Sequence, residues 1–161
     1  MFKRKKVFDF EIAKQSIRKY CSFQERCQSE VKNRLVQMGL SIRVVDNILS
    51  DLILEGYISE ERYAKAYVRG KFKIKKWGRI KIKQSLISKR VTFKCIEIGL
   101  LEIDEIEYRN CLENLISKRL LISPQKDSKS ALLKYFQNRG FENHLILELI
   151  QEKVDSPSNK T

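Results

Sequence analysis

A recurring pattern at the ends of predicted helices is the feature of this chain that most constrains its fold. Three segments share the order of a helix end, a C′ position and one apolar residue, namely 35–40, 86–91 and 136–141. Their C′ positions are Gly39, Arg90 and Gly140, so the pattern returns after 51 residues and again after 50. A period of this length accommodates three short helices with their turns. Units of this kind bury their apolar faces mainly on neighbouring units. The sequence therefore predicts an all-α fold, an elongated tandem array of three three-helix repeats.

The same period divides the chain into five parts. We expect a basic N-terminal extension over residues 1–8, followed by three-helix repeats over 9–58, 59–103 and 104–154. Residues 155–161 contain no apolar side chain, which predicts a disordered tail. The middle repeat is the one in which we expect basic residues to be concentrated.

Local start and stop signals predict the helices around the first repeat boundary. Ser41 is placed as the N-cap of a helix that ends before Gly56 in the C′ position, and Ser59 is placed as the next N-cap. The helix after Ser59 carries two stripes at helical spacing, roughly 120° apart on a helical wheel. The aromatic stripe is Tyr63, Tyr67, Gly70 and Ile74, and the basic stripe is Arg62, Lys65, Arg69 and Lys73. We expect the first stripe to face a core and the second to face a partner.

Basic charge is concentrated in one segment of the chain. Residues 62–94 contain 13 Lys or Arg and no Asp or Glu, and the formal net charge of the whole chain is +13. Such a block attracts polyanions or an acidic protein surface, at the expense of self-repulsion in the folded state. The candidate partner-binding residues in this block are Arg62, Lys65, Arg69, Lys71, Lys73, Lys75, Lys76, Arg79, Lys81 and Lys83. The alternative is that the lysines form only a solvated face.

Trp77 and Gly78 form a predicted turn between two helices of the basic segment. Lysines around such a turn offer donors and charge to phosphates, and an aromatic ring such as that of Trp77 can stack on exposed bases. The other interpretation is that Trp77 packs between helices. Ile82 and Leu86, one helical turn apart, are expected to lie in the core.

The chain lacks the residue patterns of common catalytic and metal sites. It has no nucleotide-binding glycine loop, and its single His144 lies far in sequence from the cysteines, which form no C-x-x-C pair. We therefore expect no catalytic residue, no metal, no cofactor and no small-molecule substrate. The carboxylates at 97–107 are close in sequence around a helix start, which favours a solvated face over a nuclease site.

The expected location of the protein is the cytoplasm. Its four cysteines are interpreted as free thiols in a reducing compartment. The charged residues at the start are not followed by the apolar segment of a signal peptide, and no apolar run is long enough to span a membrane.

Three spaced motifs occupy the first two predicted repeats. The first element is Arg26, Glu30, Leu35, Gly39 and Leu40, the second is the segment 55–64, and the third is Gly78, Ile82, Leu86 and Lys89. In this order they resemble the motifs of the RecX family, the bacterial modulators of the RecA recombinase. The similarity covers about residues 10–95 well, and the third repeat, through Arg139 to Phe141, more weakly. The resemblance implies the same fold of tandem three-helix repeats.

The resemblance also implies a function without chemistry of its own. Proteins of this family bind RecA, lodge along the helical groove of the RecA–DNA filament and restrain its ATPase, strand-exchange and co-protease activities. We therefore expect a non-enzymatic regulator in DNA repair and recombination whose partners are RecA and the RecA–DNA filament. Some members bind DNA directly, which adds single- or double-stranded DNA to the expected partners. The alternative is a helical nucleic-acid-binding module that acts alone through the basic middle repeat.

Two positions depart from the family pattern: Ser85 replaces a usual Glu, and Arg90 stands at a C′ position where the family usually has Gly. A residue with a side chain is strained at positive φ, which is the usual conformation at C′. We therefore expect this turn either to differ in geometry or to lower the stability of the second repeat.

Overall fold

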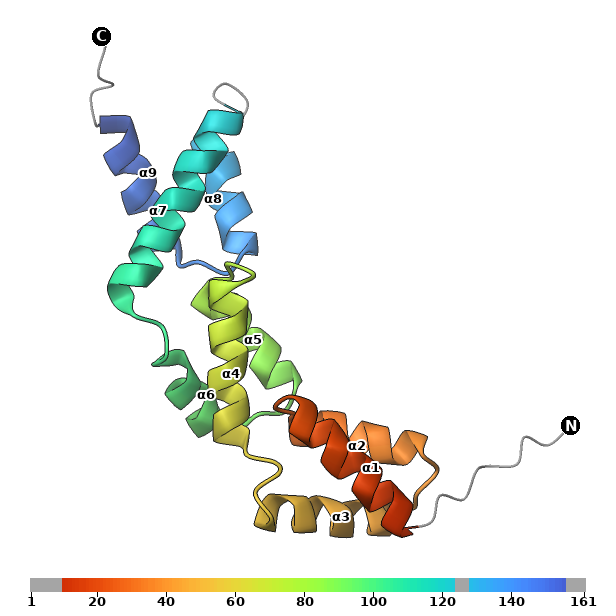
Figure 1. Ribbon diagram of the computed structural model, residues 1–161. Helices are drawn as coiled ribbons and strands as arrows, with labels where there is room; N and C mark the ends of the chain where they lie inside the picture. The colour runs from red at the N-terminus through yellow and green to blue at the C-terminus, as the bar shows by residue number, and fades with distance from the viewer. Residues whose placement is uncertain (1–9, 124–127, 156–161) are drawn as a thin grey trace, which may run out of the picture. The chain divides into compact units, whose positions relative to one another are not determined.

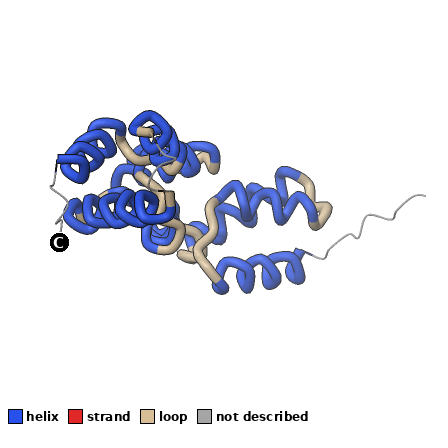
Figure 2. Tube along the Cα trace, turned by 90° about the horizontal axis from the view of Figure 1, so that it is seen from above, coloured by secondary structure: helices blue, strands red, loops and turns tan. Residues whose placement is uncertain are grey.

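The computed structural model describes residues 10–123 and 128–155, and every regular element within these ranges is an α-helix (Figure 1; Figure 2). No strand occurs in this part of the chain, which confirms the predicted all-α class. The predicted extension over 1–8 and the tail after Asp155 lie outside the described residues. Across the described ranges, no helix is both long enough and apolar enough for a membrane span.

The helices of the described chain follow one another in three groups of three. The first group is α1 (Phe10–Phe23), α2 (Gln28–Gln37) and α3 (Ile42–Leu54). The second group is α4 (Glu60–Lys73), α5 (Arg79–Ser88) and α6 (Phe93–Leu100). The third group is α7 (Glu105–Ile122), α8 (Lys129–Asn138) and α9 (Asn143–Asp155). This order confirms three three-helix repeats, while the residue boundaries between the repeats stay a prediction.

The second helix of each group is followed, two positions after its last residue, by a residue with left-handed backbone conformation. Positive φ values occur at Gly39 (87°), Arg90 (61°) and Gly140 (92°). After α5, the Val91 N–H donates to the Leu86 carbonyl at 3.2 Å, and after α8 the Phe141 N–H donates to the Phe136 carbonyl at 3.1 Å. Bonds of this span are typical of a Schellman motif at a helix C-terminus. The three predicted C′ positions are confirmed, and Arg90 keeps the turn geometry despite a strained backbone.

The predicted caps at the first repeat boundary are also present. The Ser41 hydroxyl accepts the Val44 N–H at 3.5 Å at the start of α3. Gly56, after the end of α3, has a φ of 79°. At the start of α4, the Ser59 hydroxyl accepts the Arg62 N–H at 3.3 Å. Each of these side chains satisfies a backbone donor that the helix itself leaves without a partner.

The described chain divides into two compact units, each with its own apolar core. Unit 1 comprises residues 10–67 and 86–99, and unit 2 comprises residues 68–85, 100–123 and 128–155. The division falls inside α4 and inside α5, so a part of each of these helices belongs to each unit, and it assigns Leu100, the last residue of α6, to unit 2.

In unit 1, α2 packs against α1 and α3 around buried aliphatic side chains. The core residues include Ile17, Val31, Leu35, Val45, Ile48, Leu52 and Ile58. Burial of each of these side chains contributes roughly 1.5–3 kcal/mol. On α6, a Cβ added to Gly99 would lie 3.0 Å from the carbonyl carbon of Ala64 on α4. The missing side chain at Gly99 therefore permits the close approach of these two helices.

A polar cluster within unit 1 joins α2 to the end of α5. Glu30 Oε2 accepts the Cys27 N–H at 3.1 Å, and Glu30 Oε1 lies 3.1 Å from Lys89 Nζ and 3.5 Å from the Tyr63 hydroxyl. The Ser29 hydroxyl donates to the Lys89 carbonyl at 3.0 Å. Burial opposes ionisation of Glu30, but the hydrogen bonds from Cys27 and Lys89 outweigh it and lower the pKa of the carboxyl group.

In unit 2, α9 packs against α7 and α8, and three aromatic rings follow one another through the core. The ring centroids of Phe72 and Tyr108 are 5.7 Å apart, and those of Tyr108 and Phe141 are 5.2 Å apart. Fully buried aliphatic residues of this unit include Ile82, Leu112, Ile116, Ile146 and Leu149. The predicted burial of Ile82 in unit 2 and of Leu86 in unit 1 is confirmed.

The buried face of α4 differs from the predicted aromatic stripe. Tyr63 is buried as expected, but Tyr67 and Gly70 are half-buried and Ile74 is 77% exposed. The residues that α4 buries are Tyr63, Ala64, Val68 and Phe72. The prediction was wrong for the second half of the stripe. Because α4 ends at Lys73, Ile74 lies beyond the helix, and its position on a helical wheel no longer indicates where it faces.

Candidate functional site

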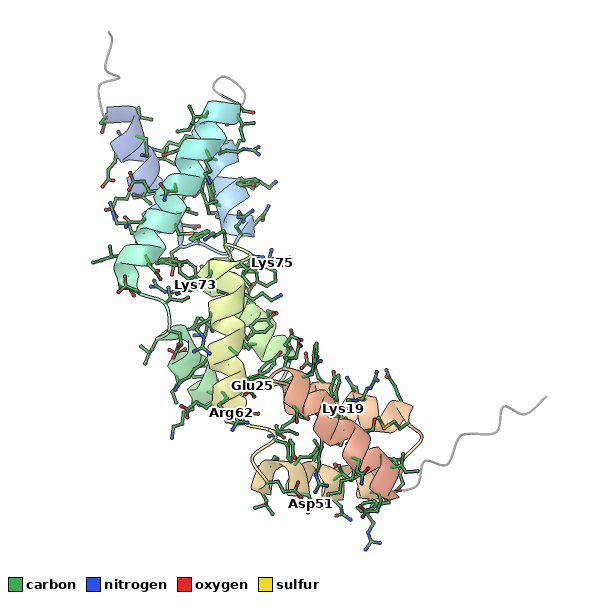
Figure 3. The ribbon with its side chains drawn as sticks, in the orientation of Figure 1. Lys19, Glu25, Asp51, Arg62, Lys73 and Lys75 are labelled. Atoms are coloured by element: carbon green, nitrogen blue, oxygen red, sulfur yellow. The ribbon has the colours of Figure 1, made fainter. Side chains whose placement is uncertain are left out.

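The ten predicted partner-binding residues lie on α4, on the turn after it and on α5, and Arg62 and Lys65 are the two in unit 1. Arg62 Nε lies 3.0 Å from Glu25 Oε1, and Arg62 Nη2 donates to the Gly56 carbonyl at 2.7 Å (Figure 3). Lys65 Nζ lies 2.7 Å from Glu61 Oε1, one helical turn earlier. Both cations therefore neutralise carboxylates of their own unit.

In unit 2, Arg69 and Arg79 also pair with acidic residues. Arg69 Nη1 lies 2.8 Å from Glu102 Oε2. Arg79 Nη2 lies 2.6 Å from Glu105 Oε1, and Arg79 Nη1 lies 3.6 Å from Glu142 Oε1. These carboxylates belong to residues outside the acid-free segment 62–94. The folded chain therefore offsets part of the charge that appears unbalanced in the sequence.

Arg79 is further fixed by the buried ring of Tyr108. The Arg79 guanidinium carbon lies 3.9 Å from the Tyr108 ring centroid, and the Arg79 N–H donates to the Tyr108 hydroxyl at 3.0 Å. The same hydroxyl donates to Glu142 Oε2 at 2.7 Å. Burial raises the pKa of the Tyr108 hydroxyl well above its ordinary value of 10, and the bond to Glu142 raises it further. Tyr108 thus stays protonated and holds the start of α5 against α7.

The other six candidates lie around the turn between α4 and α5, and we call this surface the basic turn. Its members are Lys71, Lys73, Lys75, Lys76, Lys81 and Lys83. Lys73 and Lys75 flank the C-terminal end of α4 (Figure 3). Lys73, Lys75 and Lys76 are exposed, and within the described chain their ammonium groups pair with no carboxylate. Three uncompensated positive charges thus fall within four consecutive residues.

The backbone of the basic turn is held by Arg139, which lies between α8 and α9. Arg139 Nη2 donates to the carbonyls of Lys75 at 3.0 Å and Lys76 at 3.4 Å. Lys76 has a positive φ of 54°, and the Trp77 N–H donates to the Lys71 carbonyl at 3.0 Å. Carbonyl groups near the end of α4 therefore find donors from the backbone and from Arg139. Capping does not require the lysine side chains, which can extend toward a partner.

Trp77 positions two of the lysines of the basic turn. Its half-buried ring has Lys71 Nζ at 4.8 Å and Lys81 Nζ at 4.5 Å from its centroid. Distances below about 6 Å are typical of cation–π attraction. The ring therefore keeps two ammonium groups at the same surface, one from α4 and one from α5. Stacking of a base on Trp77 stays a prediction.

A close contact between two backbone segments, at Gly78 and at Gly140, holds the basic turn in place. The Gly78 N–H donates to the Arg139 carbonyl at 2.8 Å, and the Ile80 N–H donates to the Gly140 carbonyl at 3.0 Å. A Cβ at Gly78 would overlap the Gly140 carbonyl, and a Cβ at Gly140 would overlap Lys81. Glycine is therefore required on both sides of this contact, and the basic turn sits on a rigid support within unit 2.

A pocket of about 220 Å³ opens beside the basic turn. Its lining residues are Phe72, Lys73, Lys76, Glu107, Asn110, Cys111 and Asn114. Burial raises the pKa of the Cys111 thiol, although the charges of Lys76 and Arg139 oppose this, so the thiol is not activated as a nucleophile. Throughout the described ranges, no cluster of three or more His, Cys, Asp or Glu could hold a metal ion. The arrangement is suited to binding an anionic surface.

The sequence analysis did not identify Arg139 or Tyr108 as residues of the site. For Arg139 a signal existed, because it directly precedes Gly140 at a predicted helix end. For Tyr108 there was none: its partners Arg79 and Glu142 are 29 and 34 residues away in sequence, and only the folded chain brings them together.

Comparisons with known proteins agree with the helical architecture. Residues 59–100 match the family model described as RecX, second three-helix domain. The chain is 28% identical over 144 residues to the regulatory protein RecX of Streptococcus uberis, covering 88% of this chain and 55% of that protein. It is 27% identical over 142 residues to the regulatory protein RecX of Streptococcus sanguinis, covering 83% of this chain and 55% of that protein. The chain thus spans about half the length of these curated relatives.

A solved structure shares the fold. The crystal structure of RecX from Lactobacillus salivarius superposes with a TM-score of 0.77 at 21% sequence identity. The superposition covers 89% of this chain and 95% of that one. At this identity the comparison concerns the fold, and it agrees with the three groups of three helices described above.

Proposed function

This chain belongs to the RecX family, and we propose that it is a non-enzymatic regulator of the RecA recombinase. In this proposal it binds the RecA–DNA filament and mainly inhibits its ATPase, strand-exchange and co-protease activities. Similarity to regulatory RecX proteins over more than four-fifths of this chain supports the proposal. Because the chain spans about half the length of those relatives, the proposal concerns the part of such a regulator that this chain contains.

The observation that carries the proposal is the set of unpaired charges on Lys73, Lys75 and Lys76. A fold that gathers three ammonium groups within four residues, none of them in an ion pair with a described carboxylate, incurs repulsion. An acidic partner surface, or the phosphates of a filament, would relieve that repulsion on binding. Arg139 and the glycine contact hold the backbone that carries these lysines in one conformation, which lowers the entropic cost of binding.

The paired cations have a different part in this proposal. Arg62, Lys65, Arg69 and Arg79 each already neutralise a carboxylate of their own unit. To contact a partner, each of these cations would replace its present carboxylate with an anion of the partner. One ion pair would then replace another, so the net electrostatic attraction would increase only slightly. We infer that they flank the contact, and that the basic turn provides most of the attraction.

Charge reversal tests the assignment of the basic turn. The triple variant K73E/K75E/K76E is compared with R43E/K94E/K134E, which changes the net charge equally at exposed positions elsewhere. We expect the first variant to bind RecA filaments at least about tenfold more weakly, because each lost charge contact at an interface contributes roughly 0.5–1 kcal/mol or more. Both variants should keep the helical circular dichroism spectrum. Filament binding is measured by co-sedimentation with RecA on single-stranded DNA.

RecA activity assays test the proposed function itself. The unmodified protein should lower the ATPase and strand-exchange rates of RecA, and the control triple variant should do the same. If the protein left both rates unchanged at several-fold excess over RecA, regulation of RecA would be rejected. Equal weakening by both triple variants would reject the basic turn as the contact surface while leaving the regulation of RecA intact.

A further inference from the structure

The ring of Tyr20 in unit 1 contacts two arginines that lie outside the acid-free segment 62–94. The guanidinium carbon of Arg26 lies 3.9 Å from the centroid of Tyr20, and that of Arg34 lies 5.4 Å from the same centroid. Tyr20 is on α1, Arg34 is on the last turn of α2, and Arg26 lies in the segment between these helices. Cation–π contacts of this kind hold a guanidinium group in place without consuming its hydrogen-bond donors.

The two guanidinium groups have no described carboxylate partner, unlike several other cations of unit 1. Among the described residues, neither Arg26 nor Arg34 forms an ion pair, and Arg26 Nε is a buried donor without an acceptor. By contrast, Arg18 pairs with Glu55 at 2.7 Å. Further paired cations of the same unit are Lys14, Lys32, Arg62, Lys65 and Lys89. Two oriented guanidinium groups with unused donors are suited to bidentate binding of phosphate.

Glu25, the neighbour of Arg26 in sequence, does not neutralise this pair of arginines. Its Oε1 accepts the Nε–H of Arg62 at 3.0 Å, and the two residues lie side by side in Figure 3. Its other oxygen, Oε2, is buried and accepts no hydrogen bond from the described residues. The acidic charge nearest in sequence is therefore already bound to a cation of the same unit.

An exposed aromatic ring lies about one helical turn from Tyr20, the residue that both arginines contact. Phe23, the last residue of α1, is 84% exposed. It follows Tyr20 by three residues and Lys19 by four, and residues at these spacings are neighbours on a helix surface. Lys19 is exposed and adds a third positive charge (Figure 3). Interleaved cations and an exposed ring are the pattern of proteins that bind single strands, in which rings stack on bases and cations bind phosphates.

We propose that Lys19, Phe23, Arg26 and Arg34 form a binding site for single-stranded nucleic acid on unit 1. Phe23 stacks on a base, Arg26 and Arg34 bind phosphate groups, and Tyr20 orients the two guanidinium groups. An acidic protein surface would satisfy the arginines equally well, but it would leave the exposed ring of Phe23 without a role. The site contains no residue of the basic turn, and it operates without RecA.

The test uses the full chain without RecA and a fluorescent thymidine oligonucleotide of about 16 nucleotides, within the usual size of single-strand sites. Phe23→Ala changes no charge and removes an exposed side chain, so the protein stays folded. We expect it to weaken binding by about 5- to 100-fold, since one base–aromatic stack contributes roughly 1–3 kcal/mol. The matched control is Phe93→Ala, at a phenylalanine of the same unit that is 61% exposed, and it should bind like the unmodified protein.

The salt dependence tests the arginines separately. Arg34→Gln should reduce the steepness of log affinity against log salt by about 0.7, as expected for one phosphate contact on a single strand. Arg43→Gln removes the same charge from an exposed position on α3 and should leave the slope unchanged. Unchanged binding by Phe23→Ala would overturn the proposal, and so would equal slopes for the two arginine variants. A poly-glutamate peptide that bound as tightly as the oligonucleotide would identify the site as one for acidic protein instead.

Discussion

Lys89 Nζ lies 3.1 Å from Glu30 Oε1, although 59 residues separate the two in the sequence. The bond joins the C-terminal end of α5 to the first turn of α2 within unit 1. Burial opposes the charge on Lys89, but the hydrogen bond and the attraction to Glu30 outweigh it and raise the pKa of the ammonium group. Each partner thus shifts the other toward its charged form, which makes their contribution to stability dependent on pH.

Glu30→Gln is predicted to lower the free energy of unfolding by about 1–2 kcal/mol at pH 7, because it weakens a cap and removes an ion pair. The fold lowers the Glu30 pKa, so its contribution is present above the ordinary value of 4.5 and is lost as pH falls through the folded-state pKa. At high pH the same argument applies to Lys89, whose pKa is raised. Its contribution to the free energy of unfolding is present below pH 10.5 and is lost as pH rises through the folded-state pKa.

Urea unfolding of Glu30→Gln and the unmodified protein, at pH 7 and at a pH below the folded-state pKa of Glu30, checks this prediction. The difference between the two proteins should shrink at the lower pH. Asp46→Asn is the control, since Asp46 pairs with Lys32 at an exposed site and its loss should change stability by less than about 1 kcal/mol. A difference that stays the same at both pH values would contradict the ion-pair explanation.

Gly78→Ala is predicted to destabilise unit 2 by roughly 1–3 kcal/mol, because the new methyl group would overlap the Gly140 carbonyl. Gly70→Ala is its matched control: nothing lies within 4 Å of the added Cβ, and the residue is inside α4. That change should stabilise the protein by about 0.5–1 kcal/mol through the lower entropy of the unfolded chain. Thermal unfolding followed by circular dichroism should show midpoints that move in opposite directions, and midpoints that move together would refute the close approach.

Arg90→Gly is predicted to raise the free energy of unfolding by up to about 1 kcal/mol. The φ of 61° at Arg90 is strained for a residue with a side chain, and glycine removes that strain. Arg43→Gly provides the comparison, because Arg43 has helical backbone conformation in the first turn of α3, where glycine should destabilise by up to about 1 kcal/mol. Chemical denaturation measures whether each variant raises or lowers the free energy of unfolding. Destabilisation by Arg90→Gly would show that the Arg90 side chain has a stabilising contact that outweighs the strain.

Leu86→Ala is predicted to destabilise the protein by about 2–5 kcal/mol, as deletion of a fully buried leucine leaves a cavity. Ile87, the next residue, is 53% exposed, so Ile87→Ala should have a much smaller effect. The two variants differ by one position along α5, and denaturant midpoints compare them directly. Similar losses of stability for both variants would mean that Leu86 does not lie on the buried face of α5.

The repeat ends could be predicted from sequence because their requirements are local. The same sequence pattern, a C′ residue followed by an apolar residue, occurs at Gly39, Arg90 and Gly140, and all three have positive φ. The caps at Ser41 and Ser59 depend on bonds to residues three positions later, which the sequence displays directly. Such features need no knowledge of the rest of the chain.

The charge pairing could not be predicted in the same way. Arg62 meets Glu25, 37 residues earlier, and Arg69 meets Glu102, 33 residues later, so a window of sequence around 62–94 contains neither acid. A charge balance counted along the chain differs from the balance in space, because folding brings distant carboxylates beside these arginines. The structure therefore leaves fewer candidate partner-binding residues than the sequence does. A count of charges along the sequence could not distinguish the three unpaired lysines, Lys73, Lys75 and Lys76, from the cations that form ion pairs.

The bonds from Arg139 to the carbonyls of Lys75 and Lys76 have a consequence for how binding and folding are related. They place a further positive charge beneath a turn that is already positive, so the free protein maintains this conformation against electrostatic repulsion. An anion that docks on the turn reduces the repulsion and favours the folded form over the unfolded one. A partner bound at this surface would therefore also contribute to the stability of the folded protein, because its negative charge would offset the repulsion within the turn.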